Sequence, residues 1–262
     1  MDFWVIYRYI LTALLGLCVG SFLNVVIYRI PKGMSLASPP SHCPRCGERV
    51  RWYDNIPVVS FALLGGRCRT CREPISPRYL LVELSHALLW LLTIHLVWDT
   101  SPVLAILYCF AISLGYCIFF IDLSEMYIPD RFTIGLAILG ILAIFFDPTT
   151  EWWEHLIGAA VGGIGFLAIY LLALLILKKE GIGLGDVKLM GAIGLLLGWQ
   201  KTLFACLIFS VVGSVVLILL NRLSHSDRER EYPFGPFIMG GTLVAMLFGD
   251  AVIGWYLGLL LG

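Results

Sequence analysis

The sequence has 262 residues, of which 59% are hydrophobic and only 14% are charged, and its mean hydropathy is +0.89. A soluble domain is nearer half apolar and a quarter charged, so this composition excludes an ordinary soluble protein and indicates a polytopic membrane protein surrounded by lipid. The net charge of zero says nothing about nucleic acid, because topology distributes the basic residues of a membrane protein. We expect no nucleic-acid partner.

The apolar runs predict an all-α polytopic membrane protein with about eight transmembrane helices. A complete crossing needs roughly 20 apolar residues, so the fourth and sixth runs are short. The first run carries Arg8 and has no cleavage-type end, so we expect a retained span rather than a signal peptide. The predicted spans lie near 6–28, 80–98, 102–121, 128–146, 156–177, 187–199, 202–220 and 237–260.

The basic residues predict how these spans are oriented. In the eight-span arrangement sixteen of the eighteen Lys and Arg residues fall on one side, and only Arg8 and Lys201 fall on the other. By the positive-inside rule the basic side is cytosolic and both termini face outward. Loop 147–155, which has no basic residue, is then external, whereas Asp122 and Asp186 both lie at the cytosolic face. The sixteen are Arg29, Lys32, Arg45, Arg49, Arg51, Arg67, Arg69, Arg72, Arg78, Arg131, Lys178, Lys179, Lys188, Arg222, Arg228 and Arg230.

Two cysteine pairs lie in the long loop between the first two spans. Cys43 and Cys46 form the first pair, and after 21 residues Cys68 and Cys71 form the second. Two such pairs are typical of a four-thiolate zinc site, which is structural because it leaves no ligand position open. Disulfides, which the cytosol disfavours, and free thiols are the alternatives. Gly47 permits a tight turn after the first pair, and the second pair has Arg72 at the equivalent position.

The second span carries a polar pair on one helix face. Glu83 and His86 are three residues apart, so they are neighbours on a helix surface. We prefer a buried, mutually satisfied pair, and a contribution to a polar site is the alternative. Elsewhere the small-xxx-small spacings Gly16/Gly20 and Gly158/Gly162 predict close helix packing.

The segment Gly183–Lys188 stands between two strongly apolar runs and contains Asp186. An ionisable residue at the edge of a span is a functional hypothesis by default, although capping of the next helix would also explain this aspartate. Its expected partner is Asp122, at the same face. Asp130 is the rival partner, with helix capping as its preferred role, and the turn Pro233–Pro236 either lines the same site or only returns the chain to the membrane.

Taken together, these motifs resemble the bacterial type IV prepilin peptidases, which are leader peptidases and N-methyltransferases of pilus and type II secretion systems. The resemblance runs from end to end, although Gly-x-Gly-Asp alone is also similar to presenilin-like proteases. It rests on Gly20–Arg29, the paired cysteines, Asp122 with Ile128-Pro129-Asp130, Gly183–Lys188 and Pro233–Pro236.

The resemblance implies that Asp122 and Asp186 are the catalytic aspartates, and that Cys43, Cys46, Cys68 and Cys71 bind zinc. It implies cleavage of the basic leader of a prepilin or pseudopilin at the cytosolic face of the bacterial inner membrane. S-adenosylmethionine would then methylate the new N-terminus, and Glu83 is a candidate participant in that second site.

The corresponding domain organisation is a first span in 1–28, a cytosolic zinc-binding loop domain in 29–79 and a transmembrane aspartic protease core in 80–262. A transporter or channel is the alternative from another class, because intramembrane aspartates also relay protons or bind cations. Against it, the aspartates lie at the membrane boundary and no inverted repeat is visible. A protease without methyl transfer is the other alternative, and the presence of the cysteine loop disfavours it.

Overall fold

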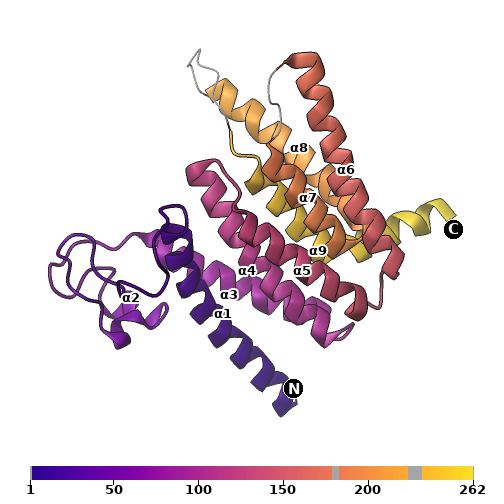
Figure 1. The fold of residues 1–262 in the computed structure, drawn as a ribbon. Coiled ribbons are helices and arrows are strands. Elements are labelled where there is room, and N and C mark those ends of the chain that lie inside the picture. The colour runs from indigo at the N-terminus through magenta and orange to yellow at the C-terminus, as the bar shows by residue number, and fades with distance from the viewer. Residues whose placement is uncertain (1, 179–182, 224–231, 262) are drawn as a thin grey trace. The chain divides into compact units, whose positions relative to one another are not determined.

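The computed structural model describes residues 2–178, 183–223 and 232–261, and within them the chain is helical with no extended strand (Figure 1). The basic residues Lys179, Arg228 and Arg230, used above for orientation, lie outside these ranges. The elements are α1 Phe3–Arg29, η1 Trp52–Asn55, α2 Val59–Leu63, α3 Pro77–Val97, α4 Pro102–Glu125, α5 Asp130–Phe146, α6 Trp152–Leu177, α7 Leu184–Leu197, α8 Trp199–Leu223 and α9 Gly235–Leu261.

Eight of these helices, α1 and α3 to α9, fall on the eight predicted apolar runs. In the described part of the chain, six are long and apolar enough to cross a membrane, namely α1, α3, α4, α6, α8 and α9. The other two have 17 residues in α5 and 14 in α7, which gives lengths of about 25 and 21 Å. A hydrocarbon core is about 30 Å thick, so the all-helical membrane fold is confirmed but a count of eight complete crossings is not.

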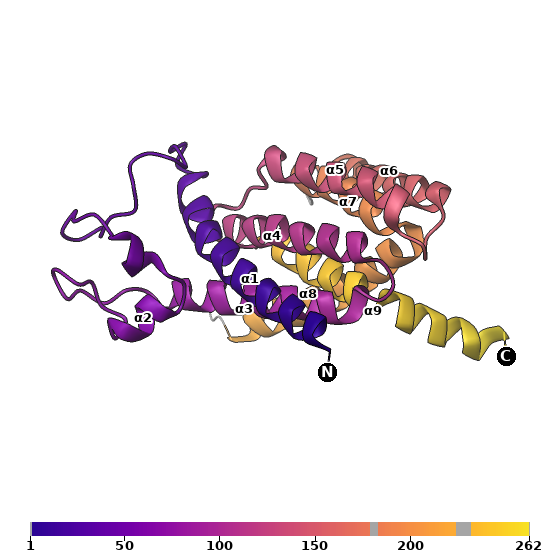
Figure 2. The same cartoon turned by 90° about the horizontal axis from the view of Figure 1, so that it is seen from below.

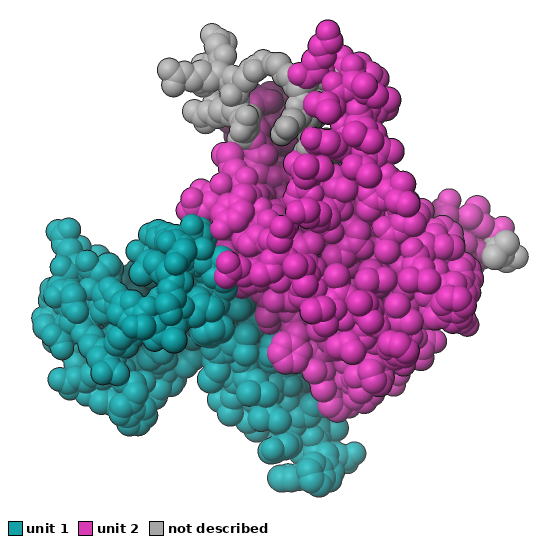
Figure 3. All heavy atoms as spheres, in the orientation of Figure 1, with its two compact units in different colours: residues 1–95 teal, residues 96–262 magenta. Residues whose placement is uncertain are grey.

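The chain divides into two compact units, residues 1–95 and 96–262 (Figure 3). The first unit contains α1, the cysteine loop and nearly all of α3. Here α1 and α3 pack through glycine: a Cβ atom on Gly16 would lie 2.9 Å from the Cα of Ala87, and one on Gly20 would lie 3.0 Å from the Cα of Glu83. The close packing predicted from the Gly16/Gly20 spacing is confirmed.

The second unit is built around its shortest helix. The helix α7 packs against α5, α6, α8 and α9, and most of its side chains are buried, including Leu189, Met190 and Ile193, which have no exposed surface. A 14-residue apolar helix is better explained as a buried core helix than as a span. The C-terminal part of α9 leads away from the other helices of this unit (Figures 1 and 2), and its large apolar side chains are exposed.

Glycines also bring α6 and α7 into contact at the level of their backbones. A Cβ on Gly158 would collide with the carbonyl oxygen of Gly194, and one on Gly162 with the carbonyl oxygen of Met190. This confirms the second predicted glycine pair and identifies α7 as its partner. Because no side chain separates the two helices, the backbone of α6 fixes the position of α7.

Candidate active site

Asp122 lies in the last turn of α4, where its side chain is buried inside the second unit. The helix ends at Met126, whose left-handed conformation (φ 55°) stops further helical growth. The Oδ2 atom of Asp122 accepts a hydrogen bond from the backbone N–H of Gly235, at 2.8 Å. A Cβ on Gly235 would lie 2.7 Å from that same oxygen, so only glycine lets the chain approach so closely. The turn Pro233–Pro236 therefore lines this site, and the specific contact at Gly235 was not predicted.

Asp186 lies in the first turn of α7 and is also buried. The backbone N–H of Gly183 donates to its Oδ2 atom at 3.1 Å, so the predicted capping role is confirmed. Capping occupies only part of the carboxylate, which has about four lone-pair positions. Gly185 lets the connection between α4 and α5 approach closely, since a Cβ on Gly185 would lie 3.3 Å from the Cβ of Ile128.

The carboxylate of Asp186 is affected by burial and by the charge of Asp122. Asp186 lies outside the six candidate spans. Its pKa is raised to about 6, because burial and, to a smaller extent, the charge of Asp122 raise it by more than the hydrogen bond from the Gly183 N–H lowers it. Neither aspartate forms an ion pair with any residue that the structure describes. Two neighbouring carboxylates without a cation do not ionise together easily, so they tend to share one proton.

The rival partner, Asp130, has a different role. Its carboxylate forms an ion pair with Lys188, with distances of 2.9 and 3.1 Å from Nζ to the two oxygens. Both side chains are more than half exposed. Asp130 is the first residue of α5, and no side-chain hydrogen bond caps that helix, so the predicted capping role of Asp130 is wrong. The ion pair with Lys188 accounts for the acidic residue at the start of α5.

The four paired cysteines form one cluster in the first unit. The sulfur atoms of Cys43, Cys46, Cys68 and Cys71 all lie within 4.8 Å of one another, and Cys43 and Cys71 are 3.8 Å apart. A tetrahedral zinc ion with Zn–S bonds of about 2.3 Å requires sulfur atoms about 3.8 Å apart. The donor set and its spacing therefore fit a four-thiolate metal site.

The two cysteine pairs have the same backbone turn. In the first, Gly47 has a φ of 71° and donates its N–H to the carbonyl of Cys43 at 2.9 Å. In the second, Arg72 has a φ of 60° and donates to the carbonyl of Cys68 at 3.1 Å. Arginine thus adopts the left-handed conformation that glycine adopts freely, and the second turn is complete despite the difference in residue type.

Glu83 and His86 contact different backbone groups. The Glu83 carboxylate accepts the N–H of Val58 at 2.9 Å, and the Nδ1 atom of His86 lies 2.8 Å from the carbonyl oxygen of Gly16. Val58 has a φ of 62°, which is strained for a β-branched residue. Glu83 therefore ties a strained point of the cysteine loop to α3, a contact that helical spacing could not reveal.

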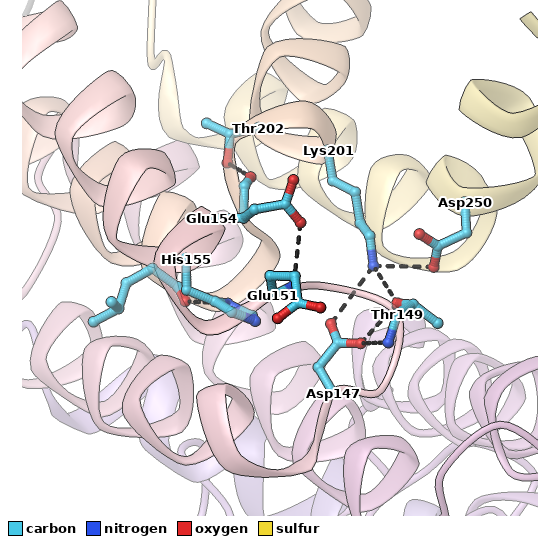
Figure 4. Close-up of polar contacts among 10 residues, drawn as sticks. Asp147, Thr149, Glu151, Glu154, His155, Lys201, Thr202 and Asp250 are labelled. Atoms are coloured by element: carbon cyan, nitrogen blue, oxygen red, sulfur yellow. Dashed lines mark hydrogen bonds and ion pairs between the residues drawn. The ribbon is translucent and has the colours of Figure 1, made fainter. Parts of the chain in front are cut away.

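A second polar cluster in the unit 96–262 was not predicted (Figure 4). The ammonium of Lys201 lies 3.0 Å from Asp250 and 3.7 Å from Asp147, and it donates to the hydroxyl of Thr149 at 3.4 Å. Thr149 in turn donates its N–H and O–H to Asp147, at 2.9 and 2.7 Å. Lys201 and Asp147 are almost fully buried, whereas the side chain of Asp250 is 57% exposed. The charged residues Asp147, Lys201 and Asp250 lie next to apolar runs in the sequence, and this pattern could have predicted the cluster.

Sequence comparisons give two family matches that together cover most of the chain. Residues 14–97 match the bacterial peptidase A24 N-terminal domain, and residues 108–218 match the type IV leader peptidase family. No solved structure matches significantly.

Three curated relatives match over nearly their whole length. A prepilin leader peptidase/N-methyltransferase of Pseudomonas aeruginosa is 34% identical over 275 residues, which cover 94% of this chain and 92% of the relative. Proteins with the same name from Aeromonas hydrophila and Legionella pneumophila are 35% and 32% identical, and cover 94% and 96% of this chain and 93% and 95% of their own length.

Proposed function

The chain belongs to the type IV leader peptidase family, and on that premise we propose that it is a bifunctional membrane enzyme that removes the leader of prepilins or pseudopilins and then N-methylates the new N-terminus. We assign hydrolysis to Asp122 and Asp186. The observation that supports this assignment is that both aspartates are buried, that the charge of Asp122 acts on Asp186, and that no cation among the described residues pairs with either. Such a pair can supply an acid and a base at once.

In the proposed mechanism the two aspartates act as one coupled pair. The ionised member takes a proton from water, and the resulting hydroxide equivalent attacks the scissile carbonyl. The protonated member donates a hydrogen bond to the developing oxyanion, and the pair then delivers a proton to the leaving amine. The N–H of Gly235 on Asp122 and that of Gly183 on Asp186 orient the carboxylates. Each hydrogen bond also stabilises the ionised form, so neither role belongs to one residue alone.

Purified enzyme and a prepilin, with the product mapped by mass spectrometry, test this assignment. Asp122→Asn and Asp186→Asn keep the side-chain size but cannot share a proton, so leader cleavage should be lost. Asp130→Asn is the matched control, because Asp130 is exposed and paired with Lys188. If Asp122→Asn still cleaves the prepilin and Asp130→Asn does not, the catalytic partner of Asp186 is Asp130 and the assignment of Asp122 is wrong.

We assign a structural zinc ion to Cys43, Cys46, Cys68 and Cys71, supported by the four mutually close thiols. Four thiolates leave no coordination position for water, so the ion would hold the loop together rather than hydrolyse a bond. Metal analysis should find one zinc per chain, and a Cys43→Ser/Cys68→Ser double variant should have none. Undiminished zinc in that variant would remove the assignment.

The orientation rests on the distribution of Lys and Arg in the sequence. We assign the enzyme to the bacterial inner membrane, with the cysteine loop and the ends of α4 and α7 that carry the aspartates on the cytosolic side. Single cysteines placed near residues 125 and 183 of a cysteine-depleted chain should react from the cytosol, and one near residue 150 from the outside. Labelling of 125 and 183 from opposite sides would contradict the proposed aspartate pair.

The second activity uses S-adenosylmethionine as the methyl donor. The neutral α-amine attacks the methyl carbon of the sulfonium, the carbon–sulfur bond breaks, and its electron pair remains on sulfur. The products are S-adenosylhomocysteine and a methylated ammonium, which loses a proton to water. An α-amine has a pKa near 8, so about a tenth is neutral at pH 7. Asp186→Asn should therefore still methylate a pre-cleaved pilin if the two sites are separate.

A further inference from the structure

The first unit contains a cavity of about 390 Å³ between the C-terminal half of α1 and the loop that carries the cysteines. Its volume lies within the range of roughly 300–1,000 Å³ that is typical of small-molecule sites. Apolar and polar side chains converge on it. The lining includes Ser21, Phe22 and Arg29 from α1, and Ser41, Asn55 and Pro57 from the loop.

The cavity contains one buried positive charge. Arg29 is only 6% exposed, and its guanidinium donates to the carbonyl oxygens of Ser35 and Pro39 at 2.9 and 2.7 Å. Within the described ranges no carboxylate pairs with it. Carbonyl oxygens orient a guanidinium but carry no net charge, so a buried arginine in this setting favours a negatively charged group of a ligand, such as a carboxylate.

The remaining wall offers an aromatic face and free polar groups. Phe22, on the helix side, is half exposed. Among the described residues the side chains of Ser21, Ser41 and Asn55 have no hydrogen-bond partner, which leaves two hydroxyls and one amide available to a ligand. An aromatic ring, a few polar groups and one charge are the usual contents of a site for a nucleoside-sized ligand.

The loop side of the cavity is anchored to α3. Pro57 lines the cavity, and its neighbour Val58 has the strained positive φ described above. The Glu83 carboxylate holds the Val58 N–H at 2.9 Å, which ties this wall to α3. Strained backbone of this kind is concentrated at ligand sites, where the surrounding structure maintains it.

We propose that this cavity binds S-adenosylmethionine, with Arg29 on the carboxylate of its methionine part, Phe22 against the adenine ring, and Ser21, Ser41 and Asn55 on its polar groups. The proposal rests on the N-methyltransferase activity proposed above and gives that activity a site. Glu83 is then a positioning residue, because it acts on the ligand only through Val58 and Pro57. The cavity recognises the carboxylate and the nucleoside of S-adenosylmethionine, and none of these contacts involves its reactive methyl group.

Equilibrium dialysis of labelled S-adenosylmethionine against the purified full-length chain tests the site without relying on catalysis. Ser21→Phe and Ser41→Phe fill the cavity and should raise the Kd at least about tenfold, a difference of about 1.4 kcal/mol. Ser85→Phe is the matched control, since Ser85 is also a partly exposed serine on a helix of this unit but lies outside the cavity. Zinc content and melting temperature should stay at wild-type values in all three variants.

A second measurement tests the role of Arg29 in the unmodified protein. Decarboxylated S-adenosylmethionine lacks the group that Arg29 would bind, so its Kd should be about tenfold or more higher than that of S-adenosylmethionine. Equal affinity for the two compounds would overturn the assigned orientation.

The possible outcomes distinguish failure of the proposed binding site from failure of the proposed methyltransferase activity. If the wild type transfers methyl groups, and Ser21→Phe and Ser41→Phe bind S-adenosylmethionine as the wild type does, this site is wrong and the activity stands. If the wild type neither binds S-adenosylmethionine nor methylates pre-cleaved pilin, both proposals fail. Loss of binding in the two cavity variants with retention in Ser85→Phe supports the site.

Discussion

Two pairs of acidic residues in the unit 96–262 differ in whether a cation among the described residues pairs with them. Asp147 and Asp250 share the ammonium of Lys201, whereas Asp122 and Asp186 are buried and, within the part of the chain that the structure describes, have only backbone N–H groups as partners. Burial raises the pKa of both Asp147 and Asp186. At Asp147 the charge of Lys201 and hydrogen bonds from Thr149 reverse that effect and lower the pKa overall. At Asp186 the neighbouring charge of Asp122 adds to it, and the pKa rises to about 6.

The difference separates a structural arrangement from a reactive one. A buried carboxylate that has a cation stays ionised and holds its neighbours in place. A buried pair without one keeps a proton within reach of neutral pH, at a cost in stability. The Lys201 group is therefore an internal control for the proposed catalytic pair, and substitutions at the two places should have opposite consequences.

The largest expected effect is on catalysis. Asp122→Asn or Asp186→Asn should slow leader cleavage by roughly 10²–10⁴-fold, the usual contribution of a general acid or base. Neither substitution should lower the melting temperature, since each removes a penalised carboxylate. Cleavage assays and thermal melting of the same preparations would check both. A variant that loses activity and stability together would show that the pair is structural.

Lys201→Met should have the opposite profile. It leaves Asp147 buried without its cation, a change that typically costs roughly 3–5 kcal/mol, and thermal or denaturant unfolding in detergent would measure it. Adding Asp147→Asn to Lys201→Met should recover much of the loss, because no unpaired charge then remains. A stable Lys201→Met single variant would contradict the structural role of this cluster.

The pH dependence of stability should also differ between the two places. The raised pKa of Asp186 means that its ionised form disfavours folding at neutral pH. This penalty should begin to shrink as the pH falls through about 6 and should be absent only below the unfolded pKa of about 3.9. The lowered pKa of Asp147 means that its contribution is fully present above its unfolded pKa of about 3.9, and is lost only as the pH falls through the lower folded value. Between pH 7 and 5 the wild type should therefore gain stability relative to Asp186→Asn, by on the order of 1–2 kcal/mol. An equal change in melting temperature in the two proteins would exclude a raised pKa at Asp186.

The smallest effect is expected at the exposed ion pair of Asp130 and Lys188. Because both side chains are more than half exposed, Lys188→Met should change stability by no more than about 1 kcal/mol. The same melting experiments would measure it. A loss as large as that of Lys201→Met would mean that exposure does not distinguish the two lysines.

The sequence predicted what depends on local pattern. Among the described residues, apolar runs located the eight helices α1 and α3 to α9, and the cysteine spacing located a cluster whose four thiols do converge. What it missed depends on tertiary contact. Lys201 and Asp250 are 49 residues apart in the sequence, and only the packing of α8 on α9 brings them together. The N–H of Gly235 reaches Asp122 from a helix 113 residues away, and no periodicity encodes such an approach. The central position of α7 was also missed, because an apolar run has the same appearance whether lipid or protein surrounds it.

The direct contact between the backbones of α6 and α7 has a consequence for how the enzyme is made. At 14 residues, α7 is shorter than the roughly 17–25 residues of a membrane span. It packs against α5 and α6, which precede it in the sequence, and against α8 and α9, which follow it. The glycines of α6 leave the ribosome first and provide the surface on which α7 docks. Asp186 therefore reaches its position only after α6 has been inserted, and Asp122 receives its hydrogen bond from Gly235 only once α9 has begun. We expect a nascent chain that ends before α9 to be inactive, so that the membrane holds no partly built protease during synthesis.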